Sequence, residues 1–163
     1  MDMLKASLKD IPILSGYLHD AYFKPEEIAF DATKQCFTMN LERVYYEGAE
    51  RGKFLWLIPV VRYPWIQSHI TMIGVQQMDR KWQDQGVDGP DDKQLLMDIE
   101  QRSEKTIVLG SNHFKITLTV AQDFELTLVD ESQPEDKPRV TDFSKGIFYG
   151  MDEINKLKVN AQQ

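Results

Sequence analysis

Residues 107–128, IVLGSNHFKITLTVAQDFELTL, carry the clearest structural signal in this chain of 163 residues. Apolar and polar side chains alternate along almost the whole stretch, and a period of two is typical of β-strands with one buried face. Turn-forming residues interrupt the pattern at 111–112 and at 121–123. Three antiparallel strands joined by two tight turns would keep the apolar residues on one face. The stretch therefore predicts a β-meander.

The alternation also predicts which residues of this meander face each other. The expected pairs are Leu109 with Phe114 and Ile107 with Ile116 in the first hairpin, and Val120 with Phe124, Leu118 with Leu126 and Ile116 with Leu128 in the second. A slip of one residue would turn each apolar set toward the solvent. One continuous strand from His113 to Asp130 satisfies the same parity, but it would be far longer than the usual ~5–6 residues.

The N-terminal part predicts one helix ahead of the strands, over residues 10–22 or starting as early as Ser7. Asp10 is suited to the N-cap, and Pro12 is tolerated because it lies in the first turn. Lys24-Pro25 should end the helix, because a residue before proline disfavours the α conformation. Apolar residues recur at spacings of three and four, the period of a helix with one buried face; they are Ile11, Leu14, Leu18 and Tyr22.

After Pro25 the period changes to two, which predicts a hairpin with its turn over residues 31–36. In the register that keeps four apolar residues on one face, Ile28 faces Met39 and Phe30 faces Phe37. After the second strand the apolar parity shifts by one. That shift favours a β-bulge near residues 42–43.

The middle of the chain predicts further strands and one long loop. Residues 53–62, KFLWLIPVVR, are apolar on both faces and predict a strand covered on both sides, with its proline at an edge or bulge. Residues 63–65 are typical of a connection, and residues 68–78 predict another strand. Residues 84–92, DQGVDGPDD, predict a long loop within one domain. Alternation of Leu95, Met97 and Ile99 predicts the strand that follows.

The C-terminal part differs in character from the rest. Residues 130–139, DESQPEDKPR, predict an exposed linker. Residues 142–158 have apolar residues at helical spacing. We therefore expect one α+β domain over residues 1–130, followed by an acidic linker and C-terminal segment, 131–163, that packs on it or stays partly disordered. The expected fold is mainly antiparallel β: about eight strands in a curled sheet or partly open barrel, with one N-terminal helix and a C-terminal helical tail.

Composition narrows the classes of function. The net charge is −7 and the 19 basic residues are scattered, whereas nucleic-acid binding requires clustered Lys and Arg. The longest apolar stretch, residues 54–61, is well short of the ~20 residues that cross a bilayer. The N-terminus has no apolar block of signal-peptide length, and the single cysteine, Cys36, fits a reducing compartment. We therefore expect a cytoplasmic protein that binds neither nucleic acid nor membrane.

Motifs for catalysis, cofactors and metals are missing from the sequence. His19, His69 and His113 lack zinc-ligand spacing, and Cys36 has no partner thiol. The loop from Asp84 resembles the front of a calcium loop, but a leucine stands where the bidentate glutamate is required. Glycine patterns for phosphate binding are absent. We expect no catalytic residue, no cofactor and no metal ligand.

One group of aromatic and basic residues is a candidate interaction surface. Tryptophan and arginine dominate recognition surfaces because each combines a large apolar face with a polar handle. Packing of the same residues in the core or in a dimer interface is the alternative. The candidate residues are Arg62, Tyr63, Trp65, Lys81 and Trp82.

Residues 10–47, DIPILSGYLHDAYFKPEEIAFDATKQCFTMNLERVYYE, and residues 95–120, LLMDIEQRSEKTIVLGSNHFKITLTV, carry a family resemblance. The first stretch, with an L-x-D-A motif over 18–21, resembles the opening of an uncharacterised family of bacterial proteins, mostly alphaproteobacterial. The second is similar to the closing strand pair of that family. The resemblance covers about residues 4–130; the chain departs from it in the strand over 53–61, the strand after residue 123 and the C-terminal tail. It implies a bacterial origin and no catalytic residues.

These observations favour a non-enzymatic binding or protein-interaction module that forms a homo-oligomer or binds a protein partner. The alternative is a small-molecule-binding barrel, or an enzyme whose site uses scattered acidic residues and histidines. A pocket that encloses His69, Trp65 and acidic groups would favour this alternative. A third hypothesis is a regulatory protein whose C-terminal tail recruits a partner.

Overall fold

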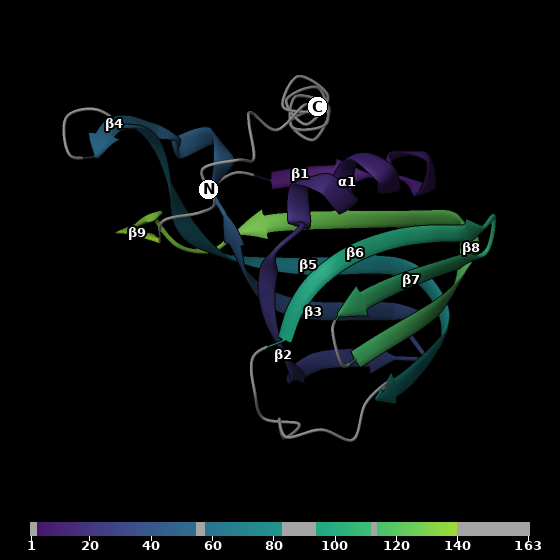
Figure 1. The fold of residues 1–163 in the computed structure, drawn as a ribbon. Coiled ribbons are helices and arrows are strands. Elements are labelled where there is room, and N and C mark those ends of the chain that lie inside the picture. The colour runs from purple at the N-terminus through teal and green to yellow at the C-terminus, as the bar shows by residue number, and fades with distance from the viewer. Residues whose placement is uncertain (1–2, 55–57, 83–93, 112–113, 140–163) are drawn as a thin grey trace.

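The computed structural model describes residues 3–54, 58–82, 94–111 and 114–139, which fold mainly as antiparallel β-strands with a short N-terminal helix (Figure 1). The helical elements are the 3-10 turns η1 (Leu8–Asp10) and η2 (Tyr46–Gly48) and the α-helix α1 (Ile11–Leu18). The strands are β1 (Met3–Ala6), β2 (Ala21–Asp31), β3 (Cys36–Val44), β4 (Glu50–Phe54), β5 (Ile58–Trp82), β6 (Gln94–Ser103), β7 (Thr106–Ser111), β8 (Phe114–Asp130) and β9 (Glu135–Arg139). The mainly antiparallel α+β fold with an N-terminal helix, which the sequence predicts, is confirmed.

The strands form one sheet in the order β1-β8-β7-β6-β2-β3-β5-β4, and β9 pairs with β5. β8 pairs with β5 as well, from Ser68 opposite Asp130 to Trp82 opposite Phe114. These two long strands bend together, and the sheet curls around an apolar interior (Figure 1). Because β5 and β8 also pair with β3, β7 and β1, they connect most of the sheet.

The bend in β5 lies at Gly74, whose φ is +84°. The β5–β8 register shifts on either side of Val75, which lies opposite Val120 in the interior of β8. A Cβ atom at position 74 would lie 3.2 Å from the Cα atom of Phe124. Left-handed backbone and close approach of another main chain are both conditions that favour glycine.

The second predicted hairpin, over residues 116–128, is wrong. Residues 121–123 do not form a turn; β8 runs through them as one strand of 17 residues. Leu126 lies opposite Met72, and Val120 lies opposite Val75, so the pairs expected within residues 116–128 are not formed. The single long strand that satisfies the same parity is the one observed, because β5 is long enough to pair with all of it.

The first predicted hairpin has the right faces and the wrong register. Ile107 lies opposite Leu118 and Leu109 opposite Ile116, two residues from the pairs expected. A shift of two keeps every side chain on its face, so the period alone cannot distinguish the two registers. In β6, a register shift after Leu96 places this residue in the core together with Ile99.

The β2–β3 hairpin has the predicted pairs, Ile28 opposite Met39 and Phe30 opposite Phe37. The predicted helix, in contrast, ends at Leu18 rather than Tyr22. Asp20 adopts a left-handed conformation, with φ of 67°, and β2 begins at the next residue. Pro25 therefore lies in β2 and not at a helix end.

Several further expectations for the chain from β3 onward are also wrong. Residues 53–54 belong to β4 and residues 58–62 to β5, two strands that pair with each other, and residues 63–65 lie inside β5. No bulge occurs in β3 near residues 42–43, because the β3–β5 register is continuous from Cys36 to Val44. Residues 135–139 of the expected linker form β9. The expected loop at 84–92 and the expected helical tail lie outside the described residues.

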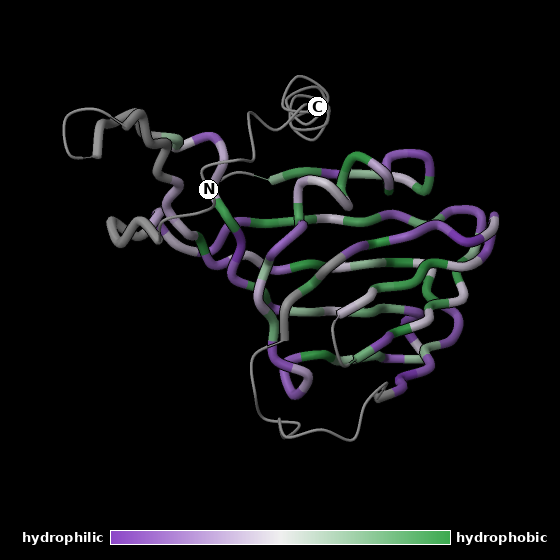
Figure 2. Tube along the Cα trace, in the orientation of Figure 1, coloured by the Kyte–Doolittle hydropathy of each residue, from purple (hydrophilic) through white to green (hydrophobic). Residues whose placement is uncertain are grey.

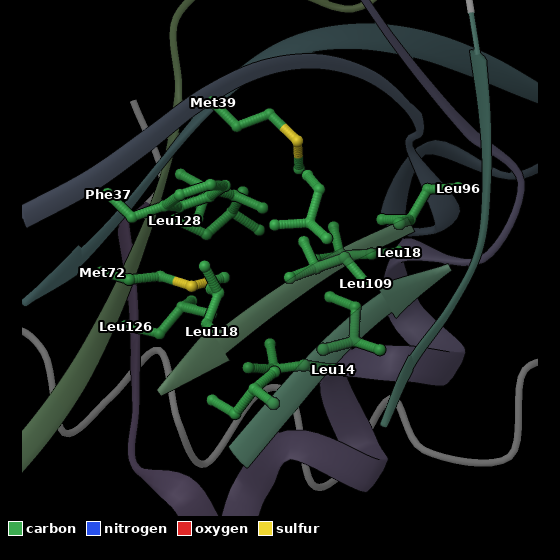
Figure 3. Close-up of a cluster of buried hydrophobic side chains, with 14 of the residues drawn as sticks. Leu14, Leu18, Phe37, Met39, Met72, Leu96, Leu109, Leu118, Leu126 and Leu128 are labelled. Atoms are coloured by element: carbon green, nitrogen blue, oxygen red, sulfur yellow. The ribbon is translucent and has the colours of Figure 1, made fainter. Parts of the chain in front are cut away.

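Hydrophobic residues recur along the strands of the sheet and along α1 (Figure 2), and apolar side chains from both long strands and from α1 fill the interior of the sheet (Figure 3). α1 contacts β6, where the Oγ of Ser15 accepts a hydrogen bond from the backbone N–H of Ile99 at 2.9 Å. The predicted helical stripe is confirmed for Ile11, Leu14 and Leu18, which are fully buried. Tyr22, its fourth member, belongs to β2.

We expect Gly74→Ala to lower the free energy of unfolding by about 1–3 kcal/mol, because alanine is strained at positive φ and its Cβ would press on the main chain of β8. Urea unfolding measures the change. Gln77→Ala, at an exposed position of the same strand, is the control and should change stability by less than about 0.5 kcal/mol. Equal stability of Gly74→Ala and the parent would contradict the assigned bend.

Candidate functional site

A buried polar cluster lies where β3, β5, β8 and α1 meet. Its members are Tyr17, Arg43, Glu47, Ser68 and Asp130, and we call it the Arg43 cluster. Arg43 follows Phe37, Met39 and Leu41 on the core face of β3, and only 1% of its surface is exposed. This explains the parity shift after Leu41: the inward position is taken by an arginine, so no bulge is needed.

Asp130 neutralises Arg43 through a bidentate ion pair. The Nη2 atom of Arg43 lies 3.0 Å from Oδ1 and 2.9 Å from Oδ2 of Asp130, and Nε lies 3.2 Å from Oδ1. The hydroxyl of Ser68 donates a further hydrogen bond of 2.7 Å to Oδ1. Nη1 of Arg43 donates to the backbone carbonyl of Val44 at 3.1 Å. Planar two-bond geometry of this kind is what allows a guanidinium to be buried.

Tyr17 closes the cluster from the helix. The guanidinium carbon of Arg43 lies 4.5 Å from the centroid of the Tyr17 ring, and the Tyr17 hydroxyl donates a hydrogen bond to Glu47. Burial raises the pKa of Tyr17 far above its usual value and outweighs the opposing effect of Arg43. Burial alone would lower the pKa of Arg43, but Tyr17, Asp130 and Glu47 together raise it. The guanidinium therefore remains charged and the phenol neutral.

Further aromatic rings extend from the Arg43 cluster. Tyr46 packs against Tyr17 with ring centroids 6.2 Å apart, and edge-on against Tyr63 at 5.4 Å. On the other face of the sheet, Tyr22 lies against Trp65 with ring centroids 5.4 Å apart.

Along β5, the five predicted surface residues fall into two groups, residues 62–65 and residues 81–82. Trp65 is 5% exposed, Tyr63 is half-buried and Lys81 is exposed. Arg62 and Trp82 occupy the two ends of β5, which spans Ile58–Trp82, and their side chains lie outside the described part. Tyr63 and Trp65 lie at the end of the sheet where these aromatic rings gather.

A pocket of about 250 Å³ lies at this end, and because its lining includes the exposed Gln67, it opens toward the outer face. It is formed by β2, β3 and β5, where four residues of β2 (24–27) lie opposite the single Asn40 of β3. Bulges of this kind re-aim side chains and are over-represented near functional sites. The residues that line the pocket are Tyr22, Phe23, Lys24, Glu27, Leu41, Glu42 and Gln67.

The pocket combines charge, hydrogen-bonding groups and one aromatic ring. Tyr22, Glu42 and Gln67 lie in one row, because Tyr22 is opposite Glu42 in β2–β3 and Glu42 is opposite Gln67 in β3–β5. Glu42 is 8% exposed, whereas Gln67 is exposed. Nζ of Lys24 lies 4.0 Å from Oε1 of Glu27. Such a pocket can hold a polar or charged group against an aromatic wall.

One signal in the sequence could have indicated the Arg43 cluster in part. The run Phe37, Met39, Leu41, Arg43 places a charge on an inward position, which requires a buried partner of opposite charge. Nothing local identifies Asp130 as that partner, since it is 87 residues away. The pocket has no such signal in the sequence. It depends on the irregular segment 24–27 of β2, and the proline in that segment is equally consistent with a helix end.

His19, His69 and Cys36 are not among the residues that line the pocket. The Nδ1 of His69 is 2.6 Å from the Oδ1 of Asn40, and that of His19 is 3.7 Å from Asp20. Cys36 is half-buried at the start of β3. Within the described ranges, no three His, Cys, Asp or Glu residues are placed to hold a metal ion. His113 lies outside the described residues.

No family model, curated protein or solved structure matches this chain. In the described part of the chain, no helix is both long enough and apolar enough to cross a membrane.

We expect Arg43→Met to lower the free energy of unfolding by about 3–5 kcal/mol, because it leaves the carboxylate of Asp130 buried without its cation. Combining it with Asp130→Leu should recover much of that loss, since the buried charge is then removed. Chemical unfolding of the two single variants and the double variant measures the coupling. If the losses of the two single variants simply add in the double variant, the unpaired charge is not the source of the lost stability.

We expect the free energy of unfolding to fall as the pH rises above about 10. Burial raises the pKa of Tyr17 and of Tyr46, and Asp20 and Tyr63 add to the effect on Tyr46. Above pH ~10 the unfolded chain has released these protons and the folded protein has not, so stability is fully present below that pH and is lost above it. Tyr46→Phe should reduce this loss of unfolding free energy with rising pH, as measured by urea unfolding at several pH values. Tyrosinate absorbance showing all six tyrosines ionising together near pH ~10 in the folded protein would contradict this.

Proposed function

We propose that this protein is a non-enzymatic binding module and that the pocket between β2, β3 and β5 receives one side chain of a protein partner. The size of the pocket carries the proposal. Cavities for small-molecule ligands and cofactors usually measure ~300–1,000 Å³. The pocket of about 250 Å³ is below that range and suits one side chain.

The position of the pocket supports a protein partner. It opens on the outer face of three neighbouring strands, where a partner chain can approach it. The interior of the curled sheet is occupied by core side chains (Figure 3), which favours recognition on the outside over a ligand held within the sheet. The ring of Tyr22, held against Trp65, supplies the kind of aromatic wall that dominates recognition surfaces.

The alternative enzyme hypothesis has less support. It required a pocket that joins His69 and Trp65 to acidic groups, and neither residue lines the pocket described here. Association into homo-oligomers, a cytoplasmic location and membership of the bacterial family remain predictions from the sequence. A binding module is compatible with all three.

Filling the pocket tests the proposal. Peptides selected from a random display library on the full chain should lose at least about tenfold in affinity for Gln67→Trp, because the indole occupies the pocket. Gln77→Trp, exposed at the far end of the same strand, should bind them unchanged. Isothermal titration calorimetry measures both. Equal affinity for the filled pocket, or no enrichment of any peptide, would refute the function.

A further inference from the structure

We infer that the side chain received by the pocket is arginine, whose guanidinium is bound between carboxylates and the Tyr22 ring. This inference rests on the proposed function and adds the chemistry of the ligand. Three features of the lining carry it: its charge, its aromatic wall and the hydrogen-bond acceptors that it offers.

The lining is acidic. Glu27 and Glu42 contribute two carboxylates and Lys24 one ammonium. Nζ of Lys24 lies 3.6 Å from Glu26 and 4.0 Å from Glu27, both within its own bulge, so its charge is shared locally. The chain as a whole has a net charge of −7, which attracts basic partners. An acidic ligand would be repelled by this net charge and by the two carboxylates of the lining.

The aromatic wall distinguishes guanidinium from ammonium. Tyr22 lines the pocket, and its ring is held at 34° to that of Trp65. A guanidinium is planar and weakly hydrated, so it stacks on aromatic faces and loses little on leaving water. An ammonium is compact and strongly hydrated, and it gains less from such a wall.

Acceptors in the pocket match the donors of arginine. Glu42 and Gln67 face each other across β3 and β5 and supply carboxylate and amide oxygens in one row with Tyr22. A carboxylate can bind a guanidinium through two parallel hydrogen bonds. The same protein binds its own Arg43 in this way: Nε and Nη2 donate to the two carboxylate oxygens of Asp130, and the Tyr17 ring lies against the guanidinium.

The test uses the ¹⁵N-labelled full chain and four capped tripeptides, acetyl-Gly-X-Gly-amide, with X as arginine, lysine, citrulline or glutamate. Citrulline has the shape of arginine without its charge. We expect the arginine peptide to shift the amide signals of Tyr22, Glu42 and Gln67, and to bind at least about tenfold more tightly than the citrulline peptide. Its affinity should exceed that of the lysine peptide and fall with added salt.

Two variants link the effect to the carboxylates. Glu27→Gln, at a partly exposed position, should weaken the arginine peptide several-fold without affecting the fold. Glu42→Gln keeps the shape of a more buried side chain and should weaken binding of the arginine peptide further. Glu125→Gln, on the exposed surface of β8, is the matched control and should bind as the parent does.

The other outcomes overturn the inference, and they can be distinguished from one another. Equal shifts with citrulline, or stronger binding of the glutamate peptide, would show a pocket that binds without selecting a guanidinium, and the proposed function would stand. No shift with any of the four peptides would overturn arginine recognition. In that case the display selection against Gln67→Trp still decides whether the pocket binds a partner at all.

Discussion

The ion pair between Arg43 and Asp130 joins parts of the chain that are 87 residues apart. Arg43 belongs to β3 and Asp130 ends β8, with Ser68 of β5 between them in the sheet. Buried charge is costly unless it is paired and fully hydrogen-bonded, and here carboxylate, hydroxyl, carbonyl and aromatic ring all contact the guanidinium. Any register other than the observed one would separate the pair. The interaction therefore selects one alignment of three strands.

The period of apolar residues predicts faces and not partners. It correctly indicates the inward residues of β3, β7 and β8, because a period of two is a property of each strand alone. It gives the wrong partner for Leu118, which lies opposite Met78 and Ile107 and not Leu126. A hairpin and a long bent strand have the same pattern. Which forms depends on whether a second long strand is present to pair with it.

The helix end shows a different limit. Tyr22 continues the helical spacing of the apolar residues at 11, 14 and 18. It nevertheless belongs to β2, and its ring packs on Trp65, 43 positions later in the chain. Contact with a distant ring outweighs a local preference that is worth a few tenths of a kcal/mol per residue. The pocket depends on this outcome, since Tyr22 in a helix could not line up with Glu42. The candidate site was therefore not predictable from local pattern.

The buried cluster and the pocket are two faces of the same strand segments. Arg43 and Ser68 point inward, and their chain neighbours Glu42 and Gln67 point outward into the pocket. Successive side chains alternate across a strand, so fixing the inner residues also fixes the outer ones. A site whose walls are already held loses less conformational entropy on binding. The ion pair inside thus also fixes the geometry of the pocket outside, on which the proposed recognition depends.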